Sequence, residues 1–245
     1  MKNRFIQFIS FMIVLAVTSQ CTYGAKAEKP INATQEHKTK NTENLISEKA
    51  NVNSINKKGM TALMIAAQGG FNEIVNILLA KGAETDIQKG LAETASSLLA
   101  KAAETNTHYD DTALILATRG RHSDIVNALL TNDAEVDKQD KHGNTALILA
   151  SERNYTEIIK ALLANDAGVN MQDKYGDTAL ILASQKGHTV AVNTLLASGA
   201  KINMQDKYGD TALILASQEG HTKIVKTLLT KGAEFNAKNK NEDTA

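Results

Sequence analysis

The stretch DKYGDTALILASQEG, residues 206–220, decides the fold of this 245-residue chain. Its aspartate and first glycine are turn-forming residues. Thr211 can cap a helix, and the apolar run after it is suited to a short helix that packs closely through its alanines. Farther on, Ile224-Val225 and Leu228-Leu229 lie three to four residues apart, which is the spacing of one face of a second helix. Gly232 follows where a helix commonly ends.

This unit recurs along the chain. The string Thr-Ala-Leu begins at Thr61, Thr112, Thr145, Thr178 and Thr211, and from Thr112 onward each interval is 33 residues. A turn, a helix, a second turn and a second helix make a unit too small to bury its own apolar faces. Stacked neighbours must bury them, so the period predicts a solenoid.

The pattern D-x-x-G-x-T-A-L-x-x-A, followed by G-H, I-V, L-L and G-A, resembles the ankyrin repeat family over about residues 41–245. The resemblance implies an all-α, ankyrin-type solenoid of stacked helix-turn-helix repeats with projecting hairpin loops and a concave face that binds proteins. The family opens its first helix with T-P-L-H, whereas this chain has T-A-L-I or T-A-L-M. Isoleucine therefore replaces the histidine that braces adjacent loops in the family, and apolar packing is expected instead, at Ile115, Ile148, Ile181 and Ile214.

The predicted organisation has three parts. Residues 1–27 are a signal peptide, 28–40 a flexible linker and 41–245 the ankyrin repeat domain. Within the domain we expect a half-repeat cap at 41–55, repeats at 56–88, 107–139, 140–172, 173–205 and 206–238, and an incomplete repeat at 239–245. Thr61 and Thr112 are 51 residues apart, 18 more than one period, so residues 89–106 are predicted to be a shortened unit with a single helix from about Ala92 to Ala103.

The signal peptide is predicted from a basic start, the apolar run Phe5 to Val17, and the small-residue site Ala25-Lys26-Ala27. Its removal takes away three basic residues and leaves 24 against 27 acidic ones, a net charge of −3, with no cysteine. We expect an exported protein, periplasmic or secreted, with no stable membrane insertion after cleavage. The alternatives are an anchor through an uncleaved signal or through a lipidated Cys21, although Gln20 fits a bacterial lipidation motif poorly.

No sequence motif indicates a catalytic function. Equal numbers of basic and acidic residues, 27 each, lack the basic excess of a nucleic-acid binder, and a single cysteine excludes a cysteine-based zinc cluster. The nucleophile elbow, the P-loop and the HExxH motif are missing. His122, His188 and His221 precede second helices in equivalent units and are interpreted as loop-bracing residues. His37 and His108 have no partners at metal-ligand spacing. We expect no catalytic residue, no metal and no cofactor.

The candidate partner-binding residues lie at the loop tips and at the ends of the first helices. Tyrosine gives a large contact area at low entropic cost and is frequent at binding hot spots. The alternative is that the tips are alike through duplication alone, because Asn170–Gln185 and Asn203–Gln218 are identical at 16 of 16 positions. The predicted set is Tyr109, His142, Tyr175, Tyr208, Lys141, Lys174, Lys207, Asp177, Asp210, Gln185 and Lys186.

These features predict an exported, monomeric, non-enzymatic scaffold that binds one or more proteins through its concave loop and inner-helix face, and no nucleic acid. The alternative is a repeat-containing secreted effector or toxin, or an accessory protein to an enzyme, whose activity the sequence does not display. That alternative requires a domain outside the repeats, and only residues 28–40 lie outside both the solenoid and the signal.

Overall fold

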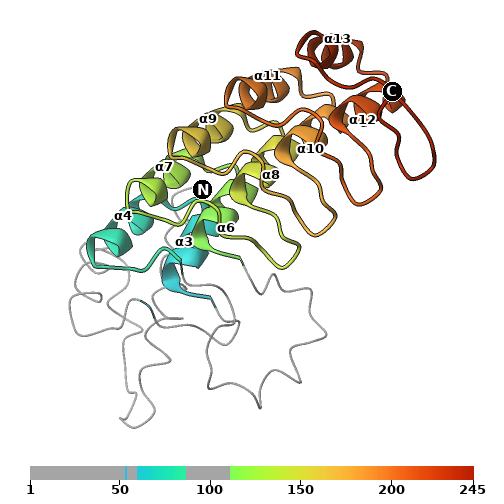
Figure 1. Ribbon diagram of the computed structural model, residues 1–245. Coiled ribbons are helices and arrows are strands. Elements are labelled where there is room, and N and C mark those ends of the chain that lie inside the picture. Colours follow the sequence, from blue (N-terminus) through green and yellow to red (C-terminus); the bar gives the residue numbers. More distant parts are fainter. Residues whose placement is uncertain (1–52, 54–59, 87–110) are drawn as a thin grey trace, which may run out of the picture.

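A computed structural model describes residue 53 and residues 60–86 and 111–245. The predicted signal peptide, the linker, most of the half-repeat cap and the shortened unit 89–106 lie outside the described residues. In the described part, ten helices form five pairs that stand side by side in one row, with loops projecting along one edge (Figure 1). The pairs are α3 (Ala62–Gly69) and α4 (Asn72–Ala80), α6 (Ala113–Arg119) and α7 (Ser123–Leu130), α8 (Ala146–Glu152) and α9 (Thr156–Ala164), α10 (Ala179–Gln185) and α11 (Thr189–Ala197), and α12 (Ala212–Gln218) and α13 (Thr222–Thr230).

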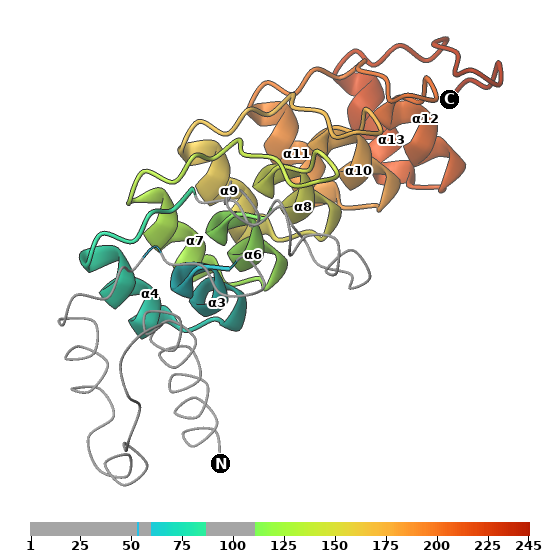
Figure 2. The same ribbon diagram turned by 90° about the horizontal axis from the view of Figure 1, so that it is seen from below.

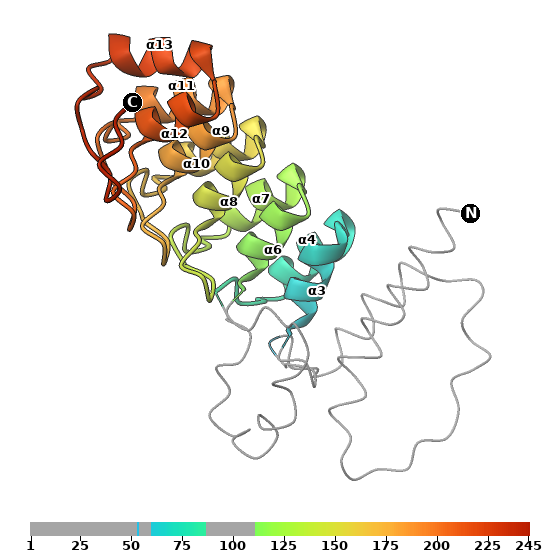
Figure 3. The same cartoon turned by 90° about the vertical axis from the view of Figure 1, so that its right-hand side faces the viewer.

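The arrangement has three layers. The projecting loops form one layer, the first helices of the pairs the middle layer, and the second helices the outer layer (Figures 2 and 3). Each first helix contacts the next first helix, and each second helix contacts the next second helix. This is the all-α solenoid of stacked repeats that the 33-residue period predicts.

The first helices begin where the sequence places a threonine cap. Thr178 Oγ1 accepts a hydrogen bond from the backbone N–H of Ile181 at 3.2 Å, and the same bond occurs at Thr112 and Thr211. The helices are only seven to nine residues long. Isolated helices of that length are unstable in water, so their stability comes from packing against neighbours.

The isoleucines that replace the family's histidine are fully buried. Each has at most 1% of its surface exposed, at Ile115, Ile148, Ile181 and Ile214. The predicted apolar packing is confirmed at these four positions. Burying one such side chain contributes about 1.5 to 3 kcal/mol.

The histidines before the second helices connect neighbouring repeats. The Nε2 atoms of His188 and His221 lie 2.9 Å from the backbone carbonyl oxygens of Glu152 and Gln185, which end the first helices of the preceding repeats. His122 makes the same contact to the carbonyl of Gln68 at 3.2 Å. The predicted bracing role of these histidines is therefore confirmed.

The two repeats on either side of residues 87–110 are direct neighbours in the stack. Helix α3 packs on α6 and α4 packs on α7. The bond from Glu135 N–H to Asp86 Oδ1 (2.7 Å) has the same place in the repeat as the bond from Lys201 N–H to Asn170 Oδ1 (2.7 Å) farther along. The shortened unit predicted at 89–106 lies outside the described residues.

The register predicted for the N-terminal cap is visible at one residue. Asn53 accepts from the backbone N–H of Glu84 and donates to its side chain, both at 2.8 Å. Asn203 makes the same two bonds to Glu234, at 3.0 and 3.1 Å. Asn53 thus contacts the repeat that follows it as Asn203 does.

Deleting residues 89–106 should leave the array folded and slightly more stable. The deletion reduces the connection between Asp86 and Asp111 from 24 residues to six and restores the 33-residue spacing between Thr61 and Thr112. Shortening a connection fourfold lowers the entropic cost of bringing its ends together by about 1 kcal/mol. Urea unfolding followed by circular dichroism measures the change. Replacing the same 18 residues with a Gly/Ser segment is the control and should leave stability unchanged. A large destabilisation in both variants would show that this segment contributes packing to the array.

Candidate partner-binding surface

The projecting loops are hairpins organised by one aspartate each. In residues 173–177, Asp173 Oδ1 accepts the backbone N–H groups of Tyr175 at 2.7 Å and Asp177 at 2.9 Å, and the Asp173 N–H donates to the Asp177 carbonyl at 3.0 Å. Gly176 has a φ of +83°, and a Cβ there would come within 2.8 Å of the backbone nitrogen of Lys207. Only glycine fits this position without strain.

The neighbouring hairpins have the same construction. The organising residue is Asp140 in residues 140–144 and Asp206 in residues 206–210, and its Oδ1 accepts the same two N–H groups at 2.7 to 2.8 Å. In the last hairpin an asparagine, Asn239, takes this role with both bonds at 2.9 Å. The structure therefore places His142, Tyr175 and Tyr208 at equivalent tip positions, as predicted from their spacing. Tyr109 lies outside the described residues.

Backbone hydrogen bonds join each tip to the next. The N–H groups of Lys174, Lys207 and Lys240 donate to the carbonyls of His142, Tyr175 and Tyr208, each at 2.8 Å. A row of hairpins joined in this way has little freedom to change the spacing of its tips.

Three glutamines strengthen the row, and the sequence interpretation missed them. Gln172 Nε2 donates to the Gly176 carbonyl of its own hairpin at 2.6 Å and to the Gln205 carbonyl of the next at 3.0 Å. Gln139 and Gln205 make the equivalent bonds. The three glutamines recur every 33 residues, and this period is the signal in the sequence that could have identified them. They brace the loops, which is the function that the family assigns to the histidine replaced here by isoleucine.

The tip side chains point into solvent to different degrees. Both tyrosines are exposed, with 53% of Tyr175 and 61% of Tyr208 accessible. His142, Lys174 and Lys207 are exposed, whereas Lys141 is half-buried. Asp177 and Asp210 are also half-buried.

The ends of the first helices approach the hairpins from the adjacent layer. Glu152, at the end of α8, is close enough to Asp177 to influence the pKa of its carboxyl group. Gln185 has the equivalent position on α10; its side chain is half-buried and its backbone carbonyl binds His221. Lys186, the next residue, is exposed. The end of α8 thus lies near the hairpin 173–177 of the next repeat.

The charge on this surface changes along the row. Arg119, at the end of α6, pairs with the buried carboxylates of Asp140 at 2.6 Å and Asp111 at 3.3 Å. In the following repeats its position is taken by Glu152, Gln185 and Gln218. Among the described residues no ion pair involves Asp173, Asp177, Asp206, Asp210 or Glu152.

This concentration of carboxylates has a measurable consequence at Asp177. Burial, which contributes most, and the negative charges of Asp173, Asp206, Asp210 and Glu152 together raise the pKa of its carboxyl group from 3.8 to about 6. The ionised form of Asp177 is disfavoured in the folded protein.

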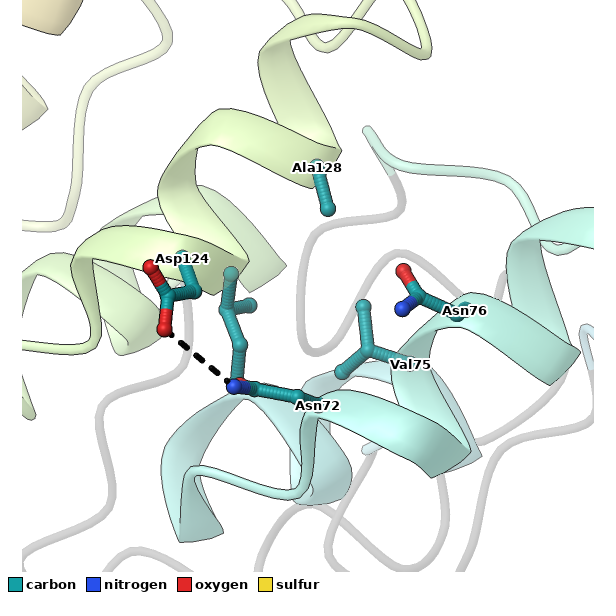
Figure 4. A pocket seen from close by; sticks show the side chains of 6 residues that line it. Asn72, Val75, Asn76, Asp124 and Ala128 are labelled. Atoms are coloured by element: carbon teal, nitrogen blue, oxygen red, sulfur yellow. Dashed lines mark hydrogen bonds between the residues drawn. The ribbon is translucent and has the colours of Figure 1, made fainter.

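Away from the hairpins, the described residues have few features that suggest a binding site. A shallow groove between α4 and α7 is lined by Asn72, Val75, Asn76, Asp124, Ile125 and Ala128, with Asn72 Nδ2 donating to Asp124 Oδ2 at 3.4 Å (Figure 4). Across residues 53, 60–86 and 111–245, no group of three or more His, Cys, Asp or Glu side chains is arranged to hold a metal ion. In the same residues, no helix has the length and apolar character needed to cross a membrane.

Comparison with known proteins assigns the repeats. A family model described as ankyrin repeats (three copies) matches residues 19–89, 87–173 and 150–239. The chain is 35% identical over 100 residues to the ankyrin repeat and KH domain-containing protein mask of Drosophila melanogaster, covering 41% of this chain and 2% of that protein. The match to mask-1 of Caenorhabditis elegans is 35% over 99 residues, 40% and 3% of the two chains. The human ankyrin repeat and KH domain-containing protein 1 matches at 35% over 100 residues, 41% and 3%. The matched stretch is thus a small fraction of these relatives.

Replacing Asp177 with asparagine should stabilise the protein at neutral pH but not in acid. Because its pKa is higher in the folded state, the folded protein binds more protons than the unfolded chain. This extra proton binding stabilises the folded protein. The contribution is fully present below pH 3.8 and is lost as the pH rises through 6. Asparagine carries no ionisable group, so Asp177→Asn avoids this loss. Its free energy of unfolding at pH 7.5 should be higher by about 1 kcal/mol, a value that allows for solvent screening of a half-exposed group.

Urea unfolding at pH 3.5 and pH 7.5 measures this difference. Asn144 already occupies the equivalent place in another hairpin, so the variant hairpin is compatible with the fold. The control is Asp166→Asn at an exposed position, which should change stability little at either pH. Equal stability of Asp177→Asn and the unmodified protein at pH 7.5 would contradict the assignment.

Proposed function

The chain belongs to the ankyrin repeat family, and we propose that it is an exported, non-enzymatic scaffold that binds a partner protein through its hairpin tips and first-helix ends. Ankyrin repeats generally mediate protein–protein interaction and are typically non-enzymatic. The location of the surface, the export and the absence of enzymatic activity are our proposal for this chain.

One observation carries the proposed surface: two large aromatic side chains, Tyr175 and Tyr208, are exposed on a row of hairpins whose backbones are joined by hydrogen bonds. Fixed backbones reduce the conformational entropy lost on binding. Tyrosine adds a broad contact area and a hydroxyl group with few rotatable bonds. The carboxylates beside the tyrosines form no ion pair in the described residues, and they supply acceptors for cationic or hydrogen-bond-donating groups of a partner.

Export is supported by the basic start, the apolar run and the small-residue site within residues 1–27. A periplasmic or secreted location follows from that interpretation. A membrane anchor through an uncleaved signal or a lipidated Cys21 is the alternative arrangement.

Changing Tyr109, Tyr175 and Tyr208 together to alanine should reduce recovery of a native partner at least tenfold in a quantitative pull-down. Each truncation of a binding hot spot typically removes more than about 1 kcal/mol, and the three losses combine. The control combines Val190→Ala and Phe235→Ala, which also truncate exposed apolar side chains, 55% and 68% accessible, but lie off the tip positions. Unchanged recovery with the tyrosine variant, or equal loss with the control, would contradict the proposed surface.

The mature protein, purified from cells that export it, should lack residues 1–27 and begin at Glu28. Intact-mass spectrometry and N-terminal sequencing measure this directly. A chain beginning at a lipid-modified Cys21 would support the lipid anchor instead. A full-length chain confined to the cytosol would contradict export.

A further inference from the structure

We propose that the partner is an extended polypeptide segment with two basic side chains three residues apart, each held by one of two subsites of identical sequence around Tyr175 and Tyr208. This inference rests on the proposed function and specifies the chemical class of the partner. It concerns only the described hairpins 173–177 and 206–210.

The two subsites share their sequence and their hairpin geometry, and they differ in that Asp210 Oδ1 also accepts a hydrogen bond from Asn239 Nδ2 at 2.7 Å. Both hairpins read DKYGD, within the 16-residue segments that are identical at every position. The Asp Oδ1 to Tyr N distance is 2.7 Å in both, and the glycine φ angles are +83° and +82°. Both tyrosines are more than half exposed. A group that is complementary to one subsite is therefore complementary to the other.

Each subsite suits a guanidinium or ammonium group. An exposed phenol ring attracts a cation to its face, and a carboxylate forms charge-assisted hydrogen bonds with the same cation. Each hairpin has two aspartates and one lysine, so its net charge is negative. Arginine is favoured over lysine because its planar guanidinium group stacks on an aromatic ring and forms bidentate hydrogen bonds with a carboxylate.

The hairpins on either side lack these features, so the number of subsites is two in the described row. Residues 140–144 read DKHGN, and Arg119 already pairs with Asp140 there. Residues 239–243 read NKNED and have no aromatic residue. Neither neighbour combines a tyrosine at the tip with two aspartates.

The spacing of the subsites selects the partner's conformation. Stacked helices lie about 8–10 Å apart, and the tips advance by one repeat through the bond from Lys207 N–H to the Tyr175 carbonyl. A polyproline II segment rises about 3.1 Å per residue with three residues per turn. Its side chains i and i+3 lie on one face about 9 Å apart, close to one repeat. A β-strand would point residues i and i+3 to opposite faces.

The test uses the full chain and four fluorescein-labelled, proline-rich peptides of equal length. One has two arginines three residues apart, one has them two apart, one has them four apart, and one has a single arginine. Fluorescence anisotropy gives the dissociation constants. We expect the three-residue spacing to bind at least tenfold more tightly than the single arginine, because the second contact becomes intramolecular. The two other spacings should bind like the single arginine.

Matched variants follow from the chain itself. The double changes Tyr175→His with Asp177→Asn, and Tyr208→His with Asp210→Asn, each convert one hairpin to the DKHGN sequence that already folds at 140–144. Either should reduce the affinity for the three-residue peptide to that of the single-arginine peptide. Val190→Ala, at an exposed position off the hairpin tips, should leave the affinity unchanged.

Three results would overturn the inference. Binding that is independent of spacing would indicate only general attraction to acidic groups. Tighter binding of a helical peptide with arginines seven residues apart, included as a fifth probe, would indicate a helical partner. Absence of peptide binding, together with tyrosine-dependent recovery of a native partner, would reject the basic segment while leaving the proposed scaffold function intact.

Discussion

Repeat-to-repeat stacking is the constraint on which the rest of the structure depends. No helix pair in the described residues has enough surface to bury its own apolar side chains, and helices of seven to nine residues do not persist alone. Each repeat therefore takes its stability from its neighbours, through buried isoleucines, the histidine bonds to preceding helix ends and the hydrogen bonds between hairpins. The same contacts that stabilise the array also set the spacing of its surface groups at one repeat.

The hairpin row shows how stability and function can be separated within one loop. Its backbone groups and organising aspartates are occupied by hydrogen bonds in and between hairpins. The tip side chains have no part in those bonds and project outward. A partner can thus contact Tyr175 and Tyr208 without disturbing the interactions that hold them in place.

The sequence predicted the local features and the periodic ones. Threonine caps, helix pairs, hairpin tips and bracing histidines all follow from residues that recur every 33 positions, because each repeat has the same local chemistry. Features that join different repeats were harder to predict. The bridging role of Gln172 depends on a carbonyl 33 residues away, and the pairing of Arg119 with Asp140 depends on how a helix end meets the next hairpin. The direct contact of α3 with α6 was also not predicted, because the two helices are neighbours in the stack although residues 87–110 separate them in the sequence.

The fold itself does not require the residues that distinguish the two identical hairpins. Hairpin 140–144 makes the same organising bonds with histidine at its tip and asparagine at its end, and hairpin 239–243 makes them with asparagine at both the first and the tip position. Tyrosine at the tip exposes an aromatic ring that folding would not select, and Asp177 is an acid whose ionised form is disfavoured where it stands. Residues that add nothing to stability, or reduce it, are those expected at a binding surface, where a partner supplies the missing contacts. Duplication explains why two hairpins share a sequence, but not why the shared sequence places an exposed ring beside carboxylates that form no ion pair in the described residues. The partner that we propose has groups that satisfy both.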